Sequence, residues 1–83
     1  MRIILHDFQE VNTFCKGIEF FNGEIDMVQN RESSGRMQKV NARSFLGICS
    51  LDLNRPIDVK ITTNDKGVEE DFYNYIKKWE AVD

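Results

Sequence analysis

The chain predicts an α+β fold: an open-faced sandwich in which helices pack on one face of a four-stranded antiparallel sheet. Residues 24–27 and 57–62 alternate apolar and polar side chains, as strands with one buried face do. Residues 8–18 and 68–79 instead carry apolar side chains at helical spacing. Because such helices and strands bury each other's apolar faces, residues 1–83 are expected to form a single domain in the order β-α-β-β-α-β-α.

The first half of the chain supplies one strand and one capped helix. Residues 1–5 are short and apolar, which predicts the first strand. Asp7 is the expected N-cap of the first helix, and Glu10 stands where a capping box needs an acid. Asn22-Gly23 is expected to end this helix through a left-handed residue. The apolar stripe of the helix consists of Phe8, Val11, Phe14, Cys15 and Ile18.

The middle of the chain predicts a hairpin followed by a short helix. The strand that begins at Glu24 is followed by polar, turn-forming residues 30–36, and residues 37–42 form the returning strand. The loop, around Ser33-Ser34-Gly35, is longer than a tight two-residue turn. Ser44 is the expected N-cap of a helix over residues 45–51.

The last strand and helix show the clearest patterns. Ile57, Val59 and Ile61 alternate with polar residues, which predicts a strand with one polar face. The terminal helix has acidic residues in its first turn and Lys77-Lys78 near its end, as the helix dipole favours. Its apolar stripe consists of Val68, Phe72, Tyr75, Ile76 and Trp79.

Composition excludes several classes of function. The formal net charge is −3, which argues against nucleic-acid binding because that function normally needs a basic face. No apolar run approaches the length of a membrane span, and the first residues lack the apolar core of a signal peptide, so we expect a cytoplasmic protein. The two cysteines are expected to be buried free thiols. No spacing of ligands indicates a metal, and no motif indicates a cofactor.

The only histidine, His6, lies where the first strand meets the first helix, and loops of this kind often carry function. The acids Asp7 and Glu10 follow it and would repel a phosphoryl group, which favours an incidental role for His6. A thiol enzyme that pairs Cys15 or Cys49 with His6 is a further alternative. Both cysteines lie on predicted apolar faces, which favours burial over catalysis.

Ser44 allows two interpretations. Its hydroxyl could simply cap the helix, which is worth roughly 1 kcal/mol. It could also accept a phosphoryl group, because the helix dipole stabilises negative charge there. Arg43 beside it could then pair with the phosphate.

The stretch VNARSFLGICSLDL, residues 40–53, resembles the second-helix region of HPr, the phosphocarrier family of the bacterial phosphoenolpyruvate:sugar phosphotransferase system. Family members typically carry V-N-A/L-K-S-I-M-G-V/L-M-S-L there. The element order is also that of HPr, so the resemblance covers nearly the whole chain. The residues that match the pattern are Val40, Asn41, Ser44, Gly47, Ser50 and Leu51.

The first loop departs from the family. HPr carries its phospho-accepting histidine in the motif G-L-H-x-R-P, whereas this chain has L-H-D-F-Q-E and lacks the Arg and the Pro. Asp7 takes the place of the active histidine in an ungapped match. His6 is therefore only a weak phospho-acceptor candidate, and no catalytic residue is assigned.

The resemblance implies a site on the second helix. In HPr of low-GC Gram-positive bacteria, the serine equivalent to Ser44 is phosphorylated by a dedicated kinase, and the helix after it docks partner proteins. The positions that this implies for partner docking are Arg43, Phe45, Leu46 and Cys49.

The expected function is that of a non-enzymatic, monomeric regulatory protein that binds other proteins but has no competent histidine phosphotransfer. Its expected partners are phosphotransferase-system enzymes, a serine kinase or a transcriptional regulator. The alternative is a working phosphocarrier in which His6 receives phosphate from phosphoenolpyruvate through the first enzyme of the system.

Overall fold

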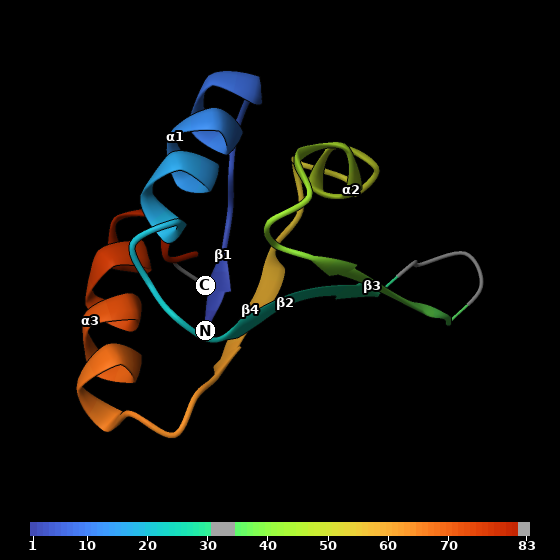
Figure 1. Ribbon diagram of the computed structural model, residues 1–83. Coiled ribbons are helices and arrows are strands. Elements are labelled where there is room, and N and C mark those ends of the chain that lie inside the picture. Colours follow the sequence, from blue (N-terminus) through green and yellow to red (C-terminus); the bar gives the residue numbers. More distant parts are fainter. Residues whose placement is uncertain (31–34, 82–83) are drawn as a thin grey trace.

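A computed structural model describes residues 1–30 and 35–81 of the chain, and it confirms the predicted α+β fold and element order (Figure 1). The four strands form one antiparallel sheet in the order β1-β4-β2-β3. Ser33 and Ser34 of the predicted long loop lie outside the described residues. The strands are β1 (Arg2–Ile3), β2 (Glu24–Asn30), β3 (Met37–Asn41) and β4 (Ile57–Thr62). The helices are α1 (Phe8–Ile18), α2 (Phe45–Cys49), α3 (Lys66–Ile76) and a closing 3₁₀ turn, η1 (Lys77–Trp79).

The two central strands bury one face of the sheet, as their alternation predicts. Every second residue of β4 is buried and its neighbours are exposed, and β2 buries Ile25, Met27 and Gln29 in the same way. The amide of Gln29 bonds the backbone of Asp52, donating to its carbonyl oxygen at 2.7 Å and accepting from its N–H at 2.8 Å. The polar side chain of Gln29 therefore has hydrogen-bond partners although it lies on the buried face of the sheet.

Helix α1 begins as predicted and ends earlier than predicted. Asp7 caps it by accepting from the N–H of Glu10 at 2.8 Å. The α-helix ends at Ile18, and the chain then passes through two tight turns before Gly23 adopts a φ of 139°, so the expectation that Asn22-Gly23 ends the helix is wrong. Phe8 is also not part of the buried stripe, since its side chain is 64% exposed at the first helical position.

Helices α1 and α3 lie on the same side of the molecule, one above the other in Figure 1, and α1 also packs against α2. Phe14 of α1 packs edge-on against Trp79, which follows α3, with ring centroids 5.6 Å apart. α2 is shorter than predicted, because the N–H of Ser50 turns back to Leu46 and Gly47 and closes the helix. Leu51 is buried just beyond it.

The first strand, β1, is shorter than the predicted range of residues 1–5. Both of its edges form backbone hydrogen bonds with other segments. β1 pairs with β4 on one side. On the other side the N–H of Ile4 donates to Trp79 and the N–H of Ala81 donates to Arg2, each at 2.9 Å. The described ends of the chain therefore meet at one edge of the sheet (Figure 1). No helix in residues 1–30 and 35–81 is both long and apolar enough to cross a membrane.

Candidate functional site

The candidate site begins at the exposed start of α2. Ser44 has an extended backbone, and its hydroxyl oxygen accepts from the N–H of Gly47 at 3.1 Å. Its own N–H donates to the carbonyl of Asn41 at 2.9 Å, which fixes the turn that leads out of β3. The prediction that Ser44 is an N-cap is confirmed, and its side chain lies at the surface.

Gly47 lies where α2 meets β3. A Cβ atom at this position would make a tight contact of 3.1 Å with Ser44 Oγ and would touch Val40 Cβ at 3.4 Å. The absence of a side chain thus lets the serine reach its amide partner while the helix stays close to the strand.

The apolar residues of α2 divide between core and surface. Ile48 is fully buried, whereas Leu46 is 81% exposed and Phe45 is 41% exposed. Cys49 is half-buried and packs against the core. The structure therefore brings Ser44, Phe45 and Leu46 together on one exposed segment, which we call the α2 apex, with Cys49 at its inner border.

Arg43, the predicted partner of a phosphate on Ser44, binds the end of α1. Its guanidinium points to the end of α1, where it donates to the carbonyls of Ile18 at 3.3 Å, Phe21 at 2.6 Å and Gly23 at 3.0 Å. Carbonyls at a helix C-terminus lack helical partners, and a cation there also complements the helix dipole. Arg43 ties the end of α1 to the start of α2 through these three hydrogen bonds.

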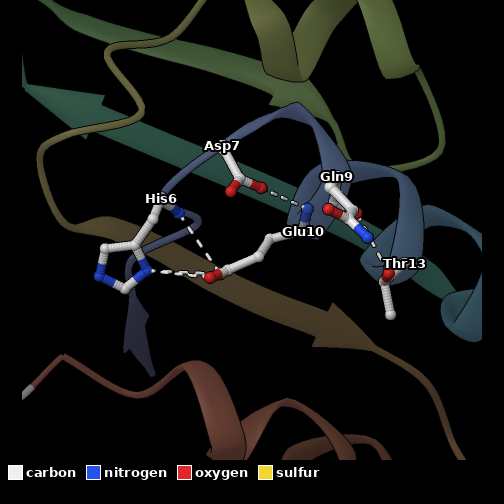
Figure 2. A network of polar contacts seen from close by, with 5 residues as sticks. All are labelled: His6, Asp7, Gln9, Glu10 and Thr13. Carbon is white, nitrogen blue, oxygen red and sulfur yellow. Dashed lines mark hydrogen bonds and ion pairs between the residues drawn. The ribbon is translucent and has the colours of Figure 1, made fainter.

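His6 is joined to Glu10 in a small exposed network at the start of α1 (Figure 2). Its Nδ1 lies 3.1 Å from one carboxylate oxygen of Glu10 and 3.3 Å from the other. The same carboxylate accepts from the backbone N–H of His6 at 3.4 Å, while Asp7 accepts from the N–H of Glu10. One ring nitrogen is therefore held by an acid whose charge opposes that of an incoming phosphoryl group.

Cys15 does not have the environment of a thiol nucleophile. Burial raises the pKa of Cys15, and the charges of Cys49 and Glu19 raise it further. A catalytic thiol needs the opposite shift. Cys15 Sγ instead lies 4.0 Å from the carbonyl oxygen of Ala42.

Among residues 1–30 and 35–81, no group of three or more His, Cys, Asp or Glu residues is arranged to hold a metal ion. Comparison with known proteins finds no matching family model, no matching curated protein and no matching solved structure.

Proposed function

We propose that the chain is a non-enzymatic, cytoplasmic protein-binding module that presents the α2 apex to a regulatory partner. The observation that carries the proposal is the exposure of two neighbouring apolar side chains, Leu46 at 81% and Phe45 at 41%, beside an exposed serine. Such side chains become buried favourably when a partner covers them. The resemblance of residues 40–53 to the docking helix of HPr supports the same assignment.

Ser44 is the proposed point of regulation, and the proposed partner is a serine kinase of the HPr kinase type. The hydroxyl is exposed and stands one residue before the two apolar side chains. A phosphoryl group there would add a charge of about −2 next to an apolar contact surface, and removing that charge from water would oppose docking.

Histidine phosphotransfer is not part of the proposed function. The His6–Glu10 pair places a carboxylate against Nδ1, and the Arg and Pro of the HPr histidine motif are missing. Both features disfavour a stable phosphohistidine.

A kinase assay tests the regulatory serine. Incubation with bacterial HPr kinase and ATP should give one acid-stable phosphate, which Ser44→Ala abolishes. Ser50→Ala is the matched control, because Ser50 is also exposed and stands at the other end of α2. If the chain takes up no phosphate while HPr is phosphorylated in the same reaction, the proposal that Ser44 is a regulatory serine is wrong.

A second assay separates the proposal from a working phosphocarrier. With phosphoenolpyruvate and the first enzyme of the phosphotransferase system, no acid-labile phosphate is expected. A label that appears and is lost in His6→Ala would overturn the proposal and establish phosphotransfer through His6.

A further inference from the structure

Asn22 and Gly23 are exposed neighbours in the turn between α1 and β2. Gly23 has a φ of 139°, and a Cβ atom there would lie 3.0 Å from the carbonyl oxygen of Thr62. The fold therefore favours glycine strongly at this position. As a result, the residue that follows Asn22 has no side chain to shield its amide nitrogen from the asparagine side chain.

The N–H of Gly23 is not used by the fold. Within residues 1–30 and 35–81, neither this N–H nor the side-chain amide of Asn22 has a hydrogen-bond partner. Buried and structured backbone amides are normally paired, so an unpaired one in an exposed turn is available for chemistry. The Gly23 nitrogen can approach the side-chain carbonyl carbon of Asn22 without first losing a hydrogen bond.

The N–H groups that follow other asparagines are engaged. Asn12 and Asn74 lie inside α1 and α3, where the next N–H donates along the helix. After Asn41, the next N–H donates to the carbonyl of Ile25 at 3.0 Å. Each of these amide nitrogens would have to break a hydrogen bond before it could attack a side chain.

The loop asparagines follow the same rule. After Asn54, the next N–H donates to the carbonyl of Asp52 at 3.2 Å, and after Asn64 the next N–H donates to the hydroxyl of Thr63 at 3.2 Å. Asn30 precedes a residue that lies outside the described part of the chain. Among the asparagines whose next residue is described, an unpaired N–H therefore follows only the one in the turn before β2.

We propose that Asn22 is a site of spontaneous deamidation whose isoaspartyl product weakens the link that Arg43 makes between α1 and α2. The nitrogen of Gly23 forms a bond to the side-chain carbonyl carbon of Asn22. The bond from that carbon to the side-chain nitrogen breaks, and ammonia leaves with the proton of the Gly23 N–H. Water then opens the succinimide at either carbonyl and gives aspartate or isoaspartate. In total one water is consumed, one ammonia is released, and a neutral amide becomes a carboxylate.

The modified residue would stand between two carbonyls that Arg43 binds. The guanidinium donates to the carbonyl of Phe21 at 2.6 Å and to that of Gly23 at 3.0 Å. In isoaspartate the main chain runs through the side-chain carbon, so one extra carbon atom separates these two carbonyls. At least one of the two hydrogen bonds should therefore lengthen or break. This proposal does not depend on partner binding through the α2 apex.

Ageing of the folded full chain in mildly alkaline buffer, followed by peptide mapping, tests the site. The peptide that contains Asn22 should gain the mass of an amide-to-acid change, and a protein isoaspartate methyltransferase with labelled S-adenosylmethionine should methylate it. The rate at Asn22 should stay within about fivefold of its rate in concentrated guanidinium chloride, whereas folding should slow Asn41 by more than this factor, which one broken hydrogen bond costs. If folding slows Asn22 as much as Asn41, the fold protects the site and the proposal is wrong.

Asn22→Gln is the matched control, because glutamine keeps the amide but must close a larger ring. This variant should lose the methyl label, and a label that persists would place the reaction at another residue and overturn the proposal.

Thermal unfolding tests the effect on Arg43. The isoaspartyl form, separated by chromatography, should unfold at a midpoint at least about 4 °C below that of the natural chain, as loss of one hydrogen bond predicts. Asn22→Asp, which has the new charge but a normal main chain, should keep the natural midpoint. An unchanged midpoint in the isoaspartyl form, or an equal fall in Asn22→Asp, would contradict the loosening of the Arg43 link by the longer main chain.

Discussion

Leu46 and Ile48 stand two positions apart in α2 and differ completely in environment, since Leu46 is 81% exposed and Ile48 is 0% exposed. Leu46→Glu should change the free energy of unfolding by no more than about 0.5 kcal/mol, because the side chain already lies in water. Ile48→Ala should lower it by about 2–5 kcal/mol through lost burial and a cavity. Urea unfolding followed by the fluorescence of buried Trp79 measures both. A large loss in Leu46→Glu would mean that Leu46 belongs to the core rather than to a docking surface.

Residue roles could be predicted where the partner is close in sequence. Asp7 and Ser44 cap their helices, and each bonds an amide three residues away, so local patterns were enough. The carbonyls that Arg43 binds belong to residues at least 20 positions away in the sequence. Gln29, on the buried face of β2, forms hydrogen bonds with the backbone of Asp52. Alternation along β2 does place Gln29 on the same face as Ile25 and Met27, but nothing local identifies the partners of either side chain.

At the level of the elements, the packing of α1 on α3 depends on Gly17. A Cβ atom there would overlap the hydroxyl and ring of Tyr75. That ring also packs on Phe21 and Trp79, and its hydroxyl donates to the carbonyl of Thr13 at 3.2 Å. Gly17→Ala would stabilise an isolated helix by about 1 kcal/mol. Here it should instead destabilise the protein by about 1–2 kcal/mol, because Tyr75 must give up these contacts.

A double-mutant cycle separates the two effects of Gly17→Ala. In a Tyr75→Ala background the overlap is gone, so the same substitution should be neutral or stabilising by chemical denaturation. An equal loss in both backgrounds would show that the glycine is needed for some reason other than the α1–α3 contact.

The extents of the elements were harder to predict than their types. In the predicted stripe of the terminal helix, Phe72, Ile76 and Trp79 are buried, whereas Val68 and Tyr75 are half-buried. Phe8 continues the stripe of α1 by spacing, yet it is exposed because it stands at the first helical position, beyond the end of the covered face. The end of α1 is not predicted by local patterns, because the chain leaves the helix through turns at Phe20 and Phe21. Distant Arg43 binds the carbonyls of Ile18, Phe21 and Gly23 there.

At the scale of the whole molecule, the α+β class and the order of elements followed from two periodicities, 2 and 3.6, read along the chain. The lateral order of the strands did not follow from them. β4 lies between β1 and β2, and the segment after η1 covers the free edge of β1. This order could not be predicted, because pairings between distant strands leave no periodic signal in either partner. The docking role proposed for the α2 apex follows from the resemblance of residues 40–53 to HPr and not from either periodicity.

The side chains of Tyr75 and Cys15 are partly buried and pack against the core. Their ionisation should make the stability of the protein depend on pH in the alkaline range. Burial raises the pKa of Tyr75, and burial together with the charges of Cys49 and Glu19 raises the pKa of Cys15. In the unfolded chain these groups ionise near their ordinary values of 10.0 and 9.0. The folded protein therefore holds more protons than the unfolded chain at high pH, so the free energy of unfolding should be insensitive to both groups below about pH 9 and should fall above it.

Urea denaturation of the reduced protein at a series of pH values from about 7.5 to 10.5 measures this dependence. The variant Cys15→Ser/Tyr75→Phe is the matched comparison, because it removes both ionisable groups and keeps side chains of similar size. It is expected to lose less stability over the alkaline range than the natural chain, although it is less stable at neutral pH through loss of the Tyr75 bond to Thr13. Identical slopes for the two proteins would contradict the role of Cys15 and Tyr75 in the alkaline loss of stability.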